Sequence, residues 1–467
     1  MLQNSLIYTK FTLFMLSEIQ AQQIIEKALT KSPAEETECL LQSHSTALTR
    51  FANNTIHQNV SEIETTLSVR IVNNQKMGRF TTNKLDDHGI EMAVKAAMEI
   101  SKVMPEQRDL LPMLGQQNYP QLNHYDESTA RYTPRQRSEA IRSILDPMAS
   151  FSVNAAGILE TGERCLALGN SSGLFAYYKN SQVTFSLTID NQGGSGYVLQ
   201  KAPKIAELNL QNESREALNN ALRSVSPSEI SPGEYTVILT PQAVANLIPF
   251  LIFDYVTGVS NFSALGVDEK RSFLTGKLGK QIFGKNFTLL DDVYHPLQFG
   301  PPFDYEGVPK QRVVLVENGV PMNLLYDRFT AKRHKTEPTG HGLPLPNTYG
   351  AFPANIVIQG ENNSFDDLIK STRKGLLVCR FWYIRLVDSA KIVLTGTTRD
   401  GTFLIENGEI TKAVQNLRFN QSLLDMLNHI VAMTPSVRVT DDESEHVYVV
   451  PAMKIEKFHF SRTVTKS

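Results

Sequence analysis

Apolar residues in the first hundred positions recur with two different periods. Helical spacing predicts one helix from Ser17 to Thr30, capped by Ser17, and a second helix that begins at Asp86-Asp87. Strand-like runs lie between them, at residues 38–43, 48–53, 62–72 and 76–81. The Asn73-Asn74 pair suits a tight hairpin turn between the last two runs. This region is therefore predicted to be α+β, with a helix flanking an antiparallel sheet.

The pattern changes beyond residue 105. Residues 105–133 are polar and punctuated by proline, which predicts a long connection. A helix is expected from Thr133-Pro134 to about Met148, and a short helix from Glu213 to Arg223. Strands are expected between them over residues 153–199, with a turn at 170–173 and a break at 193–196.

The second half begins near Ser231-Pro-Gly233, with a strand over 234–239 and an apolar helix that Pro241 opens and that extends to Val256. Short helices are expected at 365–371 and 422–433. Two Glu-Asn-Gly triplets, at 317–319 and 406–408, predict hairpin turns. Further strands are expected at residues 287–290, 312–316, 355–359, 376–386, 392–398 and 402–406. Many strands with few helices predict a curved or barrel-like second domain.

The chain length of 467 residues predicts two domains. We expect a tail or over-long start at 1–16, an N-terminal α+β domain at 17–230 and a C-terminal strand-rich domain at 231–467. Apolar content of 41% and charged content of 20% are typical of a soluble globular protein. The longest apolar run, 243–256, is shorter than a membrane span and is interrupted by polar residues, so it predicts a core helix rather than a membrane partner.

Charge and cysteine content narrow the function classes. A net charge of −2 gives no electrostatic case for a nucleic-acid partner, and the densest basic cluster, Arg328–Lys335, is expected to be a solvated strand end. The cysteines Cys39, Cys165 and Cys379 are too few and too scattered for a disulfide framework or a Cys-rich zinc site. They suit a reducing cytoplasm and are expected to be small core residues rather than nucleophiles.

Histidine spacing bears on metal chemistry. A hydrolytic zinc site is most simply built from ligands one helical turn apart. None of the ten histidines is followed by Glu, and no two stand four or five residues apart. A zinc site would have to be assembled from loops, for instance by His295, His334 and His341. A Gly-x-Ser-x-Gly elbow and a phosphate-binding loop are also absent from the sequence.

Two polar segments are candidates for binding. Asp304 and Glu306 stand in a Gly/Pro-rich bend over 299–309, and Asp291-Asp292 precedes it; such carboxylates can do acid–base work or bind a cation, but more often they accept backbone N–H bonds that hold the loop. The amide-rich stretch Arg50–Asn59 can recognise a peptide backbone, since Asn and Gln both donate and accept. Its alternative interpretation is a strand ending in an Asn-rich turn.

A series of motifs resembles the TldD/TldE (PmbA) peptidase family, formerly called modulators of DNA gyrase. The matching segments run in order along the chain: Arg50–Asn59, Ser272–Phe283, Asp291-Asp292, Phe303–Arg312, Glu317–Gly319, Pro338–Gly340, Gly375–Val378 and Leu404–Ile410. The family's catalytic members carry His-Glu-x-x-x-His on a helix and a cysteine near the C-terminus as zinc ligands. Here the matching stretch, residues 249–254, is Pro-Phe-Leu-Ile-Phe-Asp, and no cysteine follows Cys379. The chain is thus similar to the TldE (PmbA) half of the family.

The resemblance implies a cytoplasmic subunit without a metal or catalytic residue of its own. It would pair with a zinc-bearing TldD-like subunit around a chamber in which unfolded peptides are cut. Residues suggested to line the chamber or bind peptide are Asn53, Asn54, His57, Asn59, Asp304, Glu306, Arg312 and His341. The strand 376–386, with Trp382 and Tyr383, departs from the glycine-rich stretch of the family.

Two alternatives stay open beside this hypothesis. One is a self-sufficient metallopeptidase with dispersed ligands such as His295, His334 and His341. The other is a non-enzymatic, homodimeric protein that binds peptides or regulates a partner.

Overall fold

A computed structural model describes residues 15–441 and 446–463 of the chain. The expected tail at 1–16 therefore lies almost entirely outside the described residues. Met15 and Leu16 are described, and both are buried in the same hydrophobic cluster as Ile25. The Leu16 carbonyl also accepts a hydrogen bond from the Tyr177 hydroxyl at 2.9 Å. These two residues therefore belong to the folded core and not to a tail.

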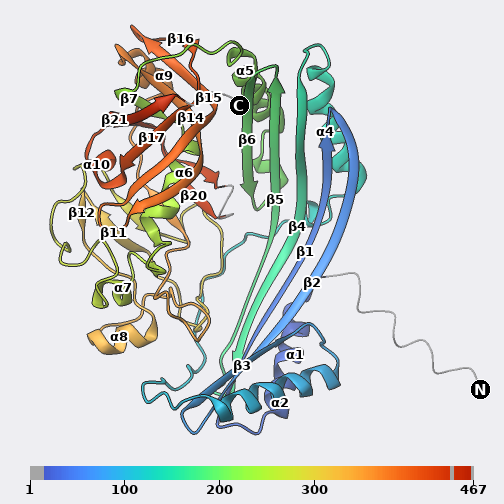
Figure 1. Cartoon of the computed structure of the whole chain (residues 1–467). Coiled ribbons are helices and arrows are strands. Elements are labelled where there is room, and N and C mark those ends of the chain that lie inside the picture. The colour runs from blue at the N-terminus through green and yellow to red at the C-terminus, as the bar shows by residue number, and fades with distance from the viewer. Residues whose placement is uncertain (1–14, 442–445, 464–467) are drawn as a thin grey trace, which may run out of the picture.

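The N-terminal half is built on one six-stranded antiparallel sheet in the order β3-β2-β1-β4-β5-β6, seen as the long blue-to-green strands of Figure 1. Its strands are β1 Glu36–Ala52, β2 Thr55–Asn73, β3 Lys76–Thr82, β4 Asn154–Asn170, β5 Phe175–Asn191 and β6 Gly194–Ala202. Helices of this half are α1 Glu18–Lys31, α2 Asp87–Val103, α3 Glu127–Ala130, α4 Pro134–Met148 and α5 Leu210–Arg223, with a 3₁₀ turn at Ile205–Glu207.

Side-chain alternation divides the two faces of this sheet. On β1, Cys39 and Leu41 pack with α1 and α2, and Phe51 on the same face packs with α4 and α5. Leu40 points to the other face, where it shares a cluster with Phe303 of the second half. The sheet therefore carries helices on one side and contacts the C-terminal half on the other.

Local signals placed α1 and α4 correctly, whereas α5 begins at Leu210 instead of Glu213 and α3 lies in the segment predicted to be a connection. Ser17 and Thr133 each form a capping box with the glutamine three residues on, and Pro134 occupies the first helical position of α4. The turns were less well predicted. The predicted strands at 38–43 and 48–53 are one continuous strand, and the hairpin turn is Asn74-Gln75, both with positive φ, rather than Asn73-Asn74.

The break expected at 193–196 is wrong. Gly194 and Gly196 lie inside β6, and the turn is formed by Gln192-Gly193. The glycine at 196 is required by packing, because an added Cβ would lie 1.8 Å from the Ala217 carbonyl oxygen of α5.

The C-terminal half contains a small closed barrel, as the sequence predicted. Strands pair in the order β14-β7-β21-β17-β15, and β15 also pairs with β14, which closes the ring. The barrel strands are β7 Gly233–Leu239, β14 Lys374–Asp388, β15 Val393–Glu406, β17 Leu417–Ser422 and β21 Met453–Thr463, with β16 Glu409–Ala413 and β18 Ile430–Met433 attached. Phe381, Phe419 and Phe458 fill its interior, with ring centroids 4.8 to 5.6 Å apart.

A second sheet packs beside the barrel in the order β12-β11-β10-β13-β20-β19. Its strands are β10 Leu289–Asp291, β11 Val313–Glu317, β12 Val320–Pro321, β13 Ile356–Ile358, β19 Val437–Thr440 and β20 Val447–Val450. The remaining elements are α6 Pro241–Ile252, α7 Ala264–Asp268, α8 Arg328–His334, α9 Phe365–Lys370, α10 Leu423–Asn428 and the pair β8 Phe253–Asp254 with β9 Val259–Ser260.

Four predictions in this half need correction. The helix from Pro241 ends at Ile252 and not at Val256, because Phe253 and Asp254 pair with β9. The helix expected at 422–433 ends at Asn428, and β18 then pairs with β21. The strands expected at 392–398 and 402–406 are the single strand β15. Basic segment Arg328–Lys335 is a helix and its cap, not a strand end.

Both Glu-Asn-Gly turns are confirmed, with positive φ at the Asn and the Gly of each. Across the part of the chain that the structure describes, no helix has the length and apolar character needed to cross a membrane.

Candidate functional site

Helix α6 is the element that corresponds to the zinc-binding helix of the family's catalytic members. Thr240 caps it by accepting the Ala243 amide, and Pro241 begins it. Every residue from Ala243 to Ile252 is buried. A helix that is apolar on all sides belongs inside a protein, and Figure 1 places α6 between β14 and β20.

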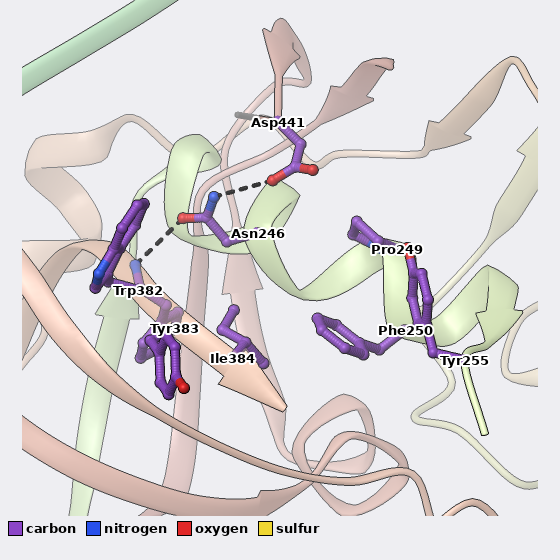
Figure 2. A pocket seen from close by; sticks show the side chains of 9 residues that line it. Asn246, Pro249, Phe250, Tyr255, Trp382, Tyr383, Ile384 and Asp441 are labelled. Atoms are coloured by element: carbon purple, nitrogen blue, oxygen red, sulfur yellow. Dashed lines mark hydrogen bonds between the residues drawn. The ribbon is translucent and has the colours of Figure 1, made fainter. Parts of the chain in front are cut away.

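A small cavity of about 20 Å³ lies between α6 and β14, which is room for about one water molecule. Figure 2 shows its lining: Asn246, Pro249, Phe250, Tyr255, Phe381, Trp382, Tyr383, Ile384 and Asp441. The Asn246 side chain donates to Asp441 Oδ1 at 3.3 Å and accepts from the Phe381 amide at 3.2 Å. This amide therefore joins α6 to β14 and to the segment after β19.

A larger cleft of about 340 Å³ opens at the start of α6, between the two halves of the chain; we call it the α5–α6 cleft. Its lining is Tyr197–Gln200 of β6, Glu213, Glu216 and Asn220 of α5, Thr240–Gln242, Cys379, Arg380, Asp400 and Val437–Val439 of β19. Strands β6 and β19 each end their sheet. Four consecutive residues of β6 line the cleft, although successive side chains of a strand point to opposite faces of the sheet. The edge of β6, and not one of its faces, is therefore turned toward the cleft.

A buried ion pair between β14 and β15 of the C-terminal half lies in the wall of this cleft. Arg380 Nη1 lies 2.7 Å from Asp400 Oδ2, and both side chains are less than one tenth exposed. Asp400 also accepts the Ser195 hydroxyl of β6 at 2.7 Å. The Arg380 guanidinium lies 3.7 Å from the ring centroid of Tyr197. One buried cluster thus ties β6 to β14 and β15.

Titratable groups in the cleft do not form a nucleophile. Burial, with the nearby Asp400 charge, raises the pKa of the Cys379 thiol to about 12, which suppresses the reactive thiolate. Burial raises the pKa of Glu213 above its ordinary value, and neighbouring Glu216 raises it further. Cys39 and Cys165 are also buried, with raised thiol pKa values.

The α6 region does not fit a zinc ion. A catalytic zinc needs three nitrogen, sulfur or carboxylate ligands and an open position. The positions that resemble the metal motif hold Pro249, Phe250 and Asp254. Asp254 Oδ1 instead accepts the Val256 and Thr257 amides at 2.8 and 2.9 Å, and holds the turn after the helix. The side chains present here supply a structural role and no metal-binding set.

The amide-rich segment lies at the turn between β1 and β2. Asn53 and Asn54 both have positive φ. The Asn54 side chain donates to the Val153 carbonyl and accepts the Ala155 amide, while Asn59 accepts the Thr49 hydroxyl. His57 is exposed, and so are the residues that follow it on β2 up to Glu64. Two of the four residues therefore have structural partners, and the peptide-binding role of the segment stays a prediction.

The carboxylates of the Gly/Pro bend hold their own loop. Asp304 accepts the amides of Glu306, Val308 and Gly342 at 2.7 to 2.9 Å. Burial raises the pKa of both Asp304 and Glu306 above their ordinary values, and the Asp304 charge raises the pKa of Glu306 further. Both side chains are buried and line no open surface of this chain.

The remaining candidate residues are dispersed. His341 Nε2 lies 3.0 Å from Asp291 Oδ1 in a fully buried pair, His334 pairs with Asp268, and Arg312 is half-exposed beside Asp292. Among residues 15–441 and 446–463, no three His, Cys, Asp or Glu side chains gather in a way that could hold a metal ion. His295, His334 and His341 are therefore not brought together.

Sequence reasoning missed the Arg380–Asp400–Ser195 cluster and the prominence of Trp382 and Tyr383. A signal was available for the aromatic pair: residues 380–385 read Arg-Phe-Trp-Tyr-Ile-Arg and contain the only tryptophan of the chain. No sequence signal was available for the hydrogen bond that joins Ser195 to this cluster, because Ser195 and Asp400 are 205 residues apart.

Comparison with known proteins gives one consistent result. Residues 232–462 match the PmbA/TldA metallopeptidase C-terminal domain, and residues 37–101 match PmbA/TldA metallopeptidase domain 1. The metalloprotease PmbA of Escherichia coli O157:H7 is 21% identical over 467 residues, covering 94% of this chain and 98% of the relative. TldE from Thermococcus kodakarensis superposes with a TM-score of 0.82 at 18% identity, covering 95% of this chain and all of that one. A putative modulator of a DNA gyrase from Thermotoga maritima superposes with a TM-score of 0.79 at 20% identity, covering 94% and 100% of the two chains.

Proposed function

The chain belongs to the PmbA/TldA metallopeptidase family, and we propose that it acts there as a peptide-binding subunit whose metal is supplied by a partner. The observation that carries this proposal is the lack of metal-binding side chains at the end of α6 and in the turn that follows it. Pro249, Phe250 and Asp254 stand at the positions that resemble the metal motif, and the only carboxylate among them is committed to a turn.

The α5–α6 cleft supports a role in holding peptide. Edge strands β6 and β19 both contribute to its lining. An extended segment can add to such an edge through backbone hydrogen bonds, with little preference for sequence. The cleft has a volume of about 340 Å³, which is too small for a folded domain, so it suits an unfolded chain better than a folded one.

A zinc-bearing TldD-like relative is the partner that this proposal requires. We also propose a cytoplasmic location, which the three free cysteines suit. A peptide held at α6 of this chain meets no metal-activated water. The peptide bond would be cut at the partner's zinc site. This subunit would narrow the entry to the shared chamber and align the peptide.

The test combines metal content, assembly and cleavage. The purified full chain should contain substoichiometric zinc by elemental analysis and should not cut an unstructured peptide. It should co-elute with a TldD-like relative from the same cell, and the mixture should cut the peptide faster than the relative does alone.

A matched control replaces the relative with a variant that lacks the glutamate of its His-Glu-x-x-x-His motif. Assembly should persist and cleavage should stop. Stoichiometric zinc and peptide cleavage by this chain alone would overturn the proposal. A stable homodimer that ignores the relative would favour the regulatory alternative.

A further inference from the structure

Strand β14 carries a distortion beside the candidate site. Trp382 pairs with Thr397 and Arg385 pairs with Thr395, so two residues of β14 oppose the single Gly396 of β15. Such a bulge changes the side-chain alternation. Phe381 and Ile384 are buried at 1% and 5% exposure, and the two residues between them, Trp382 and Tyr383, both point outward.

Tyr383 adopts a conformation that its side chain disfavours. Its φ is +53°, a region that suits Gly and Asn and is an outlier for a bulky residue. Backbone strain of this kind persists where the surrounding structure imposes it, and it gathers at functional sites. The strain here leaves the Tyr383 ring 60% exposed at the rim of the cavity that Figure 2 shows beside α6.

Arginine side chains lie over the rings of Trp382 and Tyr383. The Arg399 guanidinium lies 4.8 Å from the Trp382 ring centroid, and the Arg385 guanidinium lies 4.2 Å from that of Tyr383. Arg380, 4.9 Å from Trp382, joins this surface to the α5–α6 cleft. Asp400 and Asp441 are buried at 4% and 3% exposure, so the exposed charges that lie against the two rings are those of Arg385 and Arg399.

We propose that Trp382, Tyr383, Arg385 and Arg399, here called the aromatic pad, bind a peptide segment in which a large apolar side chain lies next to a carboxylate. The apolar side chain stacks on the exposed rings, and the carboxylate meets the guanidinium groups beside them. This inference rests on the proposed function. Pairing of a peptide with a strand edge tolerates many sequences, and the aromatic pad would add a preference for segments that carry both an acidic and a large apolar side chain.

Tryptophan content makes the pad directly observable. Trp382 is the only tryptophan of the chain, so its fluorescence reports on this surface alone. The full chain is titrated with a labelled, unstructured peptide that carries one central Phe-Asp pair. Total binding is followed by anisotropy of the label and pad binding by Trp382 emission. Matched peptides carry Ser for the Phe or Lys for the Asp.

We expect both signals to change together, with about tenfold weaker binding for each matched peptide. Tyr383→Gly should weaken binding of the Phe-Asp peptide about tenfold, while Tyr383→Phe should retain it. The glycine variant keeps its fold because glycine accepts the φ of this position. Arg399→Gln should weaken the Phe-Asp peptide and leave the Lys peptide unchanged.

Anisotropy that changes without any response of Trp382 emission would overturn the pad while leaving the proposed function intact. Equal affinity for the three peptides would also overturn it. A Trp382 response to the TldD-like relative but not to peptide would identify the surface as a subunit contact instead. Absence of any peptide binding overturns the pad, and the assembly and cleavage assay then decides the proposed function separately.

Discussion

Replacement of Arg380 tests how far the buried Arg380–Asp400 ion pair between β14 and β15 stabilises the chain. Arg380→Met keeps an unbranched side chain but removes the guanidinium, and with it the charge and the contact with the Tyr197 ring. Asp400 then stays at 4% exposure with the Ser195 hydroxyl at 2.7 Å, and Arg399 at 3.8 Å as a distant counter-charge.

The magnitude follows from the burial of the carboxylate. Breaking a buried pair by removing one partner costs about 3–5 kcal/mol, because the other charge is left without compensation. Two weaker contacts of Asp400 offset part of this, so Arg380→Met should lower the free energy of unfolding by about 3 kcal/mol. Asp400→Asn accepts the positive φ of 55° and should cost about 2 kcal/mol.

Urea unfolding of the wild type, both single variants and the double variant provides the assay. The double variant leaves no unpaired buried charge, so it should be about 2 kcal/mol more stable than the sum of the single losses predicts. Arg135→Met is the matched control, since the exposed Arg135–Glu139 pair should contribute nothing measurable. Additive single losses, or an Arg380→Met variant as stable as the control, would refute the reasoning.

Three further outcomes are expected. Burial and nearby Asp304 raise the pKa of Glu306, so the native state retains a proton that the unfolded chain releases near pH 4.5. Urea stability should therefore fall as the pH rises from there through the raised pKa. Glu306→Gln should make this fall smaller and leave the part due to Asp304, whose pKa is also raised, whereas an unchanged slope would count against the role of Glu306. Gly340→Ala would place a Cβ 2.3 Å from the Pro309 carbonyl oxygen at a φ of +76° and should cost about 3 kcal/mol in urea unfolding, against about 1 kcal/mol for Gly276→Ala, which has similar φ and open space; equal losses would exclude the clash. Cys379 should react with iodoacetamide at pH 8 far more slowly in the native chain than in urea, and equal rates, measured by mass spectrometry, would contradict its raised pKa.

Local chemistry explains which parts of the fold were predictable. The starts of α1, α4 and α6 follow from Ser17, Thr133 and Pro241, since a cap acts on amides within its own first turn. The end of α6 was not predictable, because residues 250–256 stay apolar apart from Asp254, while Phe253 and Asp254 leave the helix to pair with β9. Barrel closure also depends on distant partners, but the density of strands and turns already indicated its class.

The candidate site shows the same division. Sequence alone determined that residues 249–254 offer no histidine, and it placed Asp304 and Glu306 in a loop that they hold. Which side chains meet was decided by tertiary structure: Ser195 reaches Asp400 across 205 residues, and a bulge turns Trp382 and Tyr383 outward together. Periodicity and capping act over one or two turns of chain, whereas burial of a charge or exposure of a ring depends on what distant strands place beside it.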